Sequence, residues 1–253
     1  MRIAIRSIIV SIGIMVIILS ILTSATPDGP NSIERGPSER KSLSGGSSQQ
    51  QATGGNTTPL NVNSDRITQR WQGYFGNVSG GILLSDASGN NLYQWGLVNP
   101  SGEIYASNGT GVTWTKIDCI NFTSNPNVLK YNLTELNEFI GYTTDAQQAS
   151  EDTFNVTFNQ TFGNDGSTFT VGSRTFVNAD NCSMTTLNTD SGYQTARFRE
   201  VLLTDNESII FTALLENNID AFNSIPADFE MVVGVNGTLE GTVRNYFFYV
   251  ELS

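Results

Sequence analysis

The chain has 253 residues, and its 24 acidic side chains outnumber 13 basic ones, so the formal net charge is −11. An acidic surface of this kind repels nucleic acid and anionic lipid headgroups, and we expect neither as a partner of the folded part. The sequence has no histidine. This excludes serine, cysteine and metal hydrolase sites that depend on an imidazole.

The N-terminal segment predicts delivery to the membrane. Arg2 and Arg6 precede an uncharged apolar run from Ser7 to Ala25. Such a helix spans most of a bilayer, and the arginines favour a cytoplasmic N-terminus. Two interpretations of residues 1–25 stay open: a signal peptide cleaved after small residues, or an N-terminal membrane anchor. A pilin-type signal is disfavoured because its basic-glycine step is missing. The rest of the chain is therefore expected at the extracellular face of the cell membrane or secreted.

Residues 26–66 are expected to form a disordered, low-complexity linker. No aromatic residue occurs between Thr26 and Asp65, and four of the seven prolines lie there. A segment rich in Gly, Ser and Gln buries too little apolar area to offset its chain entropy. About 40 flexible residues reach roughly 35 Å, which predicts a tether that holds the folded domain clear of the membrane.

Residues 67–253 predict a single extracellular all-β domain, a β-sandwich of antiparallel strands with one short helix. Short aromatic and branched runs alternate with turns rich in Gly, Asn and Asp, at a spacing typical of a β-sandwich. The first strands are expected at residues 71–78, 82–85, 92–97 and 103–107. Later strands are expected at residues 196–204, 208–215, 228–235 and 245–252, the first two of these joined as a hairpin.

Two predictions concern the middle of the domain. Apolar residues at helical spacing after Asn132, which can cap a helix, predict one short helix there. Phe154 to Phe162 alternates apolar and polar residues and predicts a strand, which would turn at Asn164–Gly166 and return through Phe169 and Val171.

The two cysteines, Cys119 and Cys182, are expected to form a disulfide, because a pair of cysteines in a translocated chain most often bonds. In the chain-entropy model, closing a loop of roughly 60 residues stabilises the fold by about 4 kcal/mol. Separate buried thiols are the alternative. Two cysteines without histidine make a zinc site improbable.

Ten Asn-x-Ser/Thr sequons occur in the sequence, a modest excess over chance. Asn155 and Asn159 would lie on the polar face of the predicted strand, and Asn206 and Asn236 at turn tips. The glycosylation candidates are Asn77, Asn155, Asn159, Asn206 and Asn236.

No motif for chemistry stands out, so we assign no catalytic, cofactor-binding or metal-binding residue and expect no cofactor. A glycosidase needs only two carboxylates, but no spacing selects a pair. Oxygen ligands in the turns DASGNN, GNDGS and DNES could hold calcium, yet none matches a twelve-residue calcium loop, and ordinary Asx turns are favoured.

Aromatic residues could form a sugar-stacking platform, with Trp71, Trp95 and Trp114 as its tryptophans. Aromatic residues in strands flanked by aliphatic ones more often belong to a core, and we favour that interpretation.

Four stretches of the sequence stand out: RWQGYFGNVSGGILLSD…LYQW…NPSGEIYAS, FREVLLTD…IIFTALLE, DFEMVVGVNG and NYFFYVELS. Together they resemble a family of uncharacterised archaeal cell-surface proteins. The family is similar in its apolar N-terminal segment, low-complexity stretch and aromatic-rich β domain. The resemblance covers about Thr68 to Ser253. It implies an extracytoplasmic archaeal setting and carries no catalytic residues over.

The sequence favours a cell-envelope surface protein with a structural, adhesion or protein-interaction role and no catalytic activity. Its expected partners are the membrane, through the N-terminal segment, and other surface proteins or further copies of the chain. One alternative is the subunit of an extracellular filament assembled by strand addition. The other is a carbohydrate-binding module with a glycan ligand, or a carboxylate-dependent glycosidase.

Overall fold

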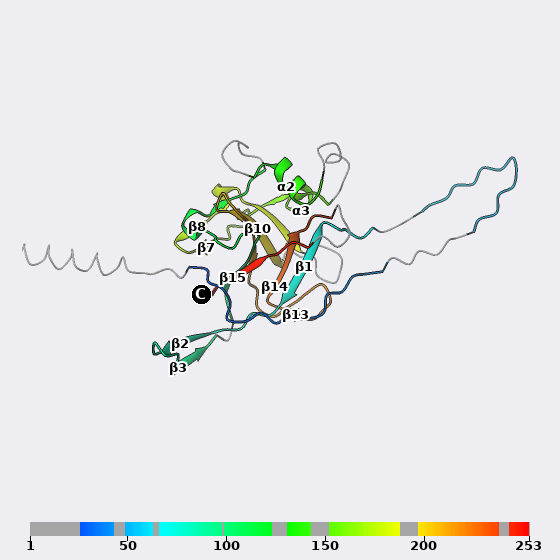
Figure 1. The fold of residues 1–253 in the computed structure, drawn as a ribbon. Coiled ribbons are helices and arrows are strands. Elements are labelled where there is room, and N and C mark those ends of the chain that lie inside the picture. Colours follow the sequence, from blue (N-terminus) through cyan, green and yellow to red (C-terminus); the bar gives the residue numbers. More distant parts are fainter. Residues whose placement is uncertain are drawn as a thin grey trace, which may run out of the picture.

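A computed structural model describes residues 26–42, 49–62, 66–97, 99–122, 131–142, 152–187, 197–237 and 243–252 of the protein. Their fold is all-β and antiparallel, as the sequence predicted, and it contains two short α-helices where one was expected (Figure 1). The strands are β1 (Trp71–Gly76), β2 (Gly81–Ser85), β3 (Asn91–Gly96), β4 (Gly102–Ser107), β5 (Asp118–Cys119), β6 (Gln160–Thr161), β7 (Phe169–Val171), β8 (Arg174–Phe176), β9 (Ser183–Leu187), β10 (Phe198–Thr204), β11 (Ile209–Leu214), β12 (Ile219–Asp220), β13 (Pro226–Ala227), β14 (Phe229–Gly234) and β15 (Phe247–Leu252). The α-helices are α2 (Leu133–Phe139) and α3 (Phe154–Thr157).

The principal sheet has the strand order β15-β4-β11-β10-β9-β6, and β5 also pairs with β10. Its centre is the predicted hairpin of β10 and β11, in which Leu202 lies opposite Phe211. Asn206 at the tip of this hairpin adopts φ 71°, a left-handed conformation that asparagine tolerates better than most residues. The last strand, β15, pairs with β4, so the end of the chain lies beside one of its first strands.

Both faces of the principal sheet are covered. On β11, Ile209 and Phe211 belong to one hydrophobic core and Ile210 to the other. A strand that is buried on both faces needs apolar residues at successive positions, which explains the nearly continuous apolar run in this hairpin.

The first core lies between the principal sheet and a two-stranded ribbon formed by β1 and β14. Met231 and Val233 of β14 pack in the same cluster as Leu202 and Phe211 of the sheet. This is the face-to-face packing of strands that the sequence predicted. Buried residues of α2 and α3 close the side of this core.

The helix predicted after Asn132 is confirmed as α2. The Asn132 side chain accepts a hydrogen bond from the Glu135 backbone nitrogen at 3.0 Å, and Glu135 accepts one from the Asn132 nitrogen at 3.0 Å. This reciprocal capping box satisfies two backbone donors that a helix start leaves open. Leu136 and Ile140 enter the first core one helical turn apart.

The strand predicted over Phe154 to Phe162 is wrong. Phe154–Thr157 form helix α3, and only Gln160–Thr161 form a strand, β6. The three buried phenylalanines, Phe154, Phe158 and Phe162, are four residues apart, a spacing that fits a helical period as well as strict alternation. Alternation would also place Val156 beside them, but Val156 is exposed on α3.

The return strand predicted through Phe169 and Val171 exists as β7, but its partner differs from the one expected. It pairs with β8 in a separate hairpin, in which Phe169 lies opposite Phe176. These two rings stack with their centroids 4.9 Å apart and enter the second core. The β7–β8 hairpin therefore covers the face of the principal sheet opposite the β1–β14 ribbon.

The predicted linker contacts the domain near its start. Asp28 forms an isolated antiparallel bridge with Val250 of β15, through backbone hydrogen bonds of 3.1 and 2.9 Å, and Pro27 is buried. This pairing was not expected from the composition of residues 26–66. The apolar run of residues 1–25 lies outside the described residues. In the part of the chain that is described, we find no helix with the length and apolar character needed to cross a membrane.

Candidate functional site

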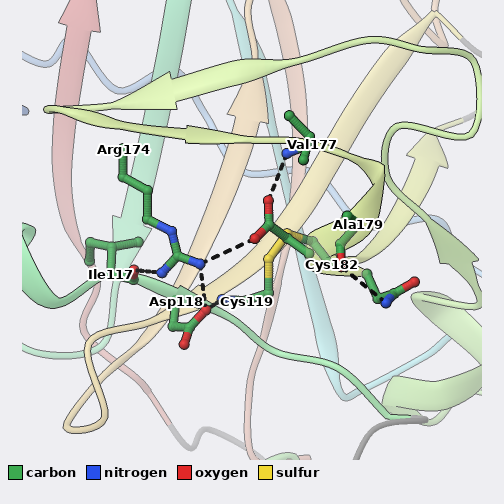
Figure 2. Close-up of polar contacts among 9 residues, drawn as sticks. Ile117, Asp118, Cys119, Arg174, Val177, Ala179 and Cys182 are labelled. Carbon is green, nitrogen blue, oxygen red and sulfur yellow. Dashed lines mark hydrogen bonds and ion pairs between the residues drawn. A yellow bond between two sulfur atoms is a disulfide. The ribbon is translucent and has the colours of Figure 1, made fainter.

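The disulfide between Cys119 and Cys182 is present and joins β5 to the residue before β9 (Figure 2). Beside it, the Arg174 guanidinium donates hydrogen bonds to the Ile117 carbonyl at 2.5 Å and to Asp118 at 2.9 Å. Arg174 also forms an ion pair with Asp180 at 3.4 Å. These contacts connect β8 to both ends of the disulfide.

The contacts of Asp180 show that this cluster is structural. One oxygen of its carboxylate faces Arg174, and the other accepts a hydrogen bond from the Val177 nitrogen at 2.8 Å (Figure 2). The Arg174 guanidinium also lies over the Phe176 ring, 4.5 Å from its centroid. Because these groups bind one another across β5, β8 and the following turn, the cluster positions chain segments against the second core.

A pair of buried carboxylates lies where β4 meets β15. Glu103 and Glu251 are directly opposite each other in the register, and both are buried. Gly102 next to them has φ 123°, and a side chain there would meet the backbone of Glu251, so the close approach of the two strands requires glycine. The sequence did not single out this pair. The available signal was an acidic residue inside the apolar run at the end of the chain.

Burial, followed by the negative charge of Glu251, raises the pKa of Glu103 to about 8. Burial also raises the pKa of Glu251. The Glu251 carboxylate accepts hydrogen bonds from the Gly172 nitrogen at 3.2 and 3.0 Å and from the Tyr105 hydroxyl at 3.3 Å. Glu251 thus holds the turn of the β7–β8 hairpin against the sheet, and Glu103 is favoured in its neutral form near pH 7.

A third buried carboxylate, Glu200 on β10, connects the two layers of the domain. It accepts a hydrogen bond from the Val232 nitrogen of β14 at 2.8 Å, while its other oxygen, Oε1, is buried without a hydrogen-bond partner. Burial raises its pKa well above the ordinary value. All three carboxylates are therefore buried, and Glu200 is buried completely.

The three candidate tryptophans occupy three separate places. Trp71 packs against Phe154 with ring centroids 5.0 Å apart, and its indole nitrogen donates to the Asp152 carbonyl at 2.8 Å. Trp114 packs between Tyr105 and Tyr249 in the second core. Trp95 alone of the three is exposed. The structure therefore brings no two of these tryptophans together on one surface, and Trp71 and Trp114 have core roles.

The hairpin of β2 and β3 projects from the body of the domain (Figure 1), and every residue from 79 to 96 is exposed. Ile82 pairs with Trp95 and Leu84 with Tyr93, so these four side chains share one face. The rings of Tyr93 and Trp95 lie 4.7 Å apart. We call this set of four residues the hairpin face. Sequence reasoning located both strands correctly but interpreted their apolar residues as core.

The turn at the tip of this hairpin is an ordinary Asx turn. The Asp86 carboxylate accepts hydrogen bonds from the Ser88 and Asn90 backbone nitrogens at 2.9 and 2.8 Å, and from the Asn90 side chain at 2.7 Å. Asp165 and Asp205 likewise accept from backbone nitrogens two or three residues further on. Within the described ranges, no group of three or more acidic or sulfur side chains is arranged to hold a metal ion.

The candidate sequons lie where a glycan could attach. Asn77, Asn155, Asn159 and Asn206 are exposed, and Asn236 is half-buried. Asn155 lies on α3 and Asn159 in the segment before β6. The sequence had suggested that both are exposed on the polar face of one strand, but neither lies on a strand.

Comparison with protein-family models, with curated proteins and with solved structures finds no match for this chain. The archaeal surface-protein resemblance stays a prediction.

Proposed function

We propose that this chain is a non-catalytic surface protein of the cell envelope, and that the β2–β3 hairpin is the element through which its rigid body contacts another envelope component. The observation that carries the proposal is the hairpin face. Four large apolar side chains are exposed together on a two-stranded element that pairs with no further strand among the described residues. Contiguous exposed apolar surface typically marks an interaction site.

The rest of the domain supports a structural role. Two cores, a buried disulfide and the Arg174 cluster hold the principal sheet on both faces. The apolar N-terminal run and the exposed sequons favour an extracytoplasmic location. The buried positions of Glu103, Glu251 and Glu200, together with the backbone partners of Glu251 and Glu200, support a role in folding rather than in acid–base catalysis.

Hydroxyl-radical footprinting of the full chain in intact cell envelopes tests the proposal. Trp95 on the hairpin and Val156 on α3 have similar exposed fractions, 48% and 45%. Each oxidation rate is normalised to the rate of the same residue in the urea-unfolded chain. If the hairpin contacts an envelope component, the normalised rate of Trp95 falls several-fold below that of Val156. Equal rates, or recovery of the protein from the cytosol, would overturn the proposal.

Strand addition at β15 is a second candidate, favoured by one observation. The outer edge of β15 already accepts a backbone bridge from Asp28, and within the described part of the chain that edge has no other strand partner. An edge of this kind can pair with a segment of another copy. Sedimentation of the full chain in detergent over a wide concentration range would then show stepwise association, and a monomer throughout would refute it.

A further inference from the structure

The chemistry of the hairpin distinguishes among its conceivable partners. Its apolar residues are accompanied by one charged side chain, Asp86 at the tip, and no lysine or arginine occurs between Arg70 and Lys116. The hairpin therefore presents a nearly neutral surface on a chain with a net charge of −11. Attraction by charge plays no part in what it binds, so burial of apolar and aromatic surface must supply the affinity.

The hairpin leaves the domain beside β15. The Leu97 nitrogen donates to the Gly80 carbonyl at 3.3 Å and closes the base of the hairpin. A side chain placed on Gly80 would lie 2.8 Å from the Leu252 methyl group, so this base packs against the end of β15. Figure 1 shows the hairpin pointing away from α2 and α3.

The segment that follows the apolar N-terminal run meets the domain at the same strand. Asp28 is bridged to Val250, two residues before Leu252 on β15. Ala25, the last residue of the run, is only three residues before Asp28, and three residues span at most about 10 Å. A bilayer that holds residues 7–25 would therefore lie close to this end of β15 and to the base of the hairpin.

This position changes the role expected for residues 26–66. The sequence predicted a tether that keeps the whole domain clear of the membrane. Because Asp28 is already paired with the domain, the distance between the membrane and β15 is set by the residues before Asp28 and not by the long segment that follows.

We propose that the hairpin face lies in the interface of the lipid bilayer and forms a second membrane contact beside the N-terminal segment. This inference rests on the proposed function and names its partner as lipid. Tryptophan and tyrosine favour the headgroup level, and the branched residues Ile82 and Leu84 favour the upper acyl chains. The insertion is shallow, because the outer edges of a two-stranded hairpin need water or headgroups as hydrogen-bond partners.

Tryptophan quenching in proteoliposomes tests the inference with the full chain. The vesicles are phosphatidylcholine with or without bromine on the upper part of the acyl chains, and bromine quenches indoles that enter the bilayer. We expect quenching of the wild-type emission and loss of most of that quenching in W95F, because Trp71 and Trp114 are packed in the cores. The quenching is expected to be the same in low and high salt.

Two further variants separate insertion from folding. The double variant I82D/L84D places charges on the hairpin face and should abolish the quenching, while its circular dichroism stays that of the wild type. The control V156D places one aspartate on exposed α3, on the opposite side of the domain (Figure 1), and should leave the quenching unchanged.

Absence of bromine quenching, or equal quenching in wild type and W95F, would overturn the lipid contact. If Trp95 is then shielded from aqueous iodide in proportion to protein density in the vesicle, its partner is a second copy. If it stays open to iodide there but is protected in cell envelopes, its partner is another surface protein. In both cases the proposed function stands while this inference fails. If Trp95 is exposed in cell envelopes as well, both the lipid contact and the proposed function are wrong.

Discussion

The β10–β11 and β2–β3 hairpins have similar local sequence patterns but opposite degrees of burial. In the β10–β11 hairpin all but one of the strand residues are buried, with cores on both faces. In the β2–β3 hairpin every residue is exposed. Both have branched and aromatic residues in paired strands around a short polar turn. The comparison shows that local pattern specifies a hairpin, while the surrounding chain decides whether its apolar face forms a core or a contact surface.

The largest expected difference between the hairpins is in their response to truncation. F211A removes a ring that is buried in the first core near Phe154 and Phe158, and should lower the free energy of unfolding by about 3–5 kcal/mol. L84A on the hairpin face should change it by less than about 0.5 kcal/mol. Urea unfolding of the two variants in detergent measures both. Similar losses would show that the β2–β3 hairpin packs in the folded protein.

Removal of the disulfide sharpens the same contrast. The loop between Cys119 and Cys182 spans 63 residues, and C119S/C182S should lose about 4 kcal/mol of stability by the chain-entropy argument. Hydrogen exchange should accelerate in β5, β9 and β10, whereas exchange in the exposed β2–β3 hairpin should not change. A uniform acceleration that includes this hairpin would contradict the separation of the two regions.

The buried carboxylates Glu103, Glu200 and Glu251 lie in the body and make its stability sensitive to pH, and none of them lies in the projecting hairpin. Because the pKa of Glu103 is raised to about 8, the folded state holds a proton that the unfolded chain releases above about pH 4.5. The contribution of Glu103 to the free energy of unfolding is complete below about pH 4.5 and is lost as the pH rises to about 8. We expect the free energy of unfolding to fall from pH 5 to pH 8 and E103Q to flatten part of that decline. An unchanged slope in E103Q would refute this assignment.

The smallest predicted effect concerns the helix that closes the first core. N132A removes the capping box of α2 and should cost about 1 kcal/mol. The control N159A changes an exposed asparagine in the same part of the chain and should be neutral within about 0.5 kcal/mol. Urea unfolding distinguishes the two, and an equal cost would mean that the cap contributes nothing.

Much of the fold could be predicted because its signals are local. The turns around Asp86 and Asn206, the cap at Asn132 and the pairing of two cysteines each depend on residues close in sequence or on simple counting. The segment from Phe154 to Phe162 could not be resolved, because a four-residue repeat fits two periods and the choice depends on the first core.

The candidate sites were harder to predict for a related reason. Glu103 and Glu251 lie opposite each other only because β15 pairs with β4, and residue spacing in the sequence does not predict that pairing. The exposure of Trp95 and the burial of Trp71 depend on which segment covers each strand. Aromatic composition alone could not separate a core residue from a contact residue.

The pairing of β4 with β15 has a consequence for biosynthesis. Tyr105 and Glu251, which share a hydrogen bond, are 146 residues apart in the chain. A ribosome must therefore add more than 140 residues after Tyr105 before β4 can acquire its second neighbour, and a nascent chain stalled before Phe247 would leave that strand at an open edge. Contacts of such long range slow folding, so the interval before the last strand arrives is when this protein has the greatest need of a chaperone.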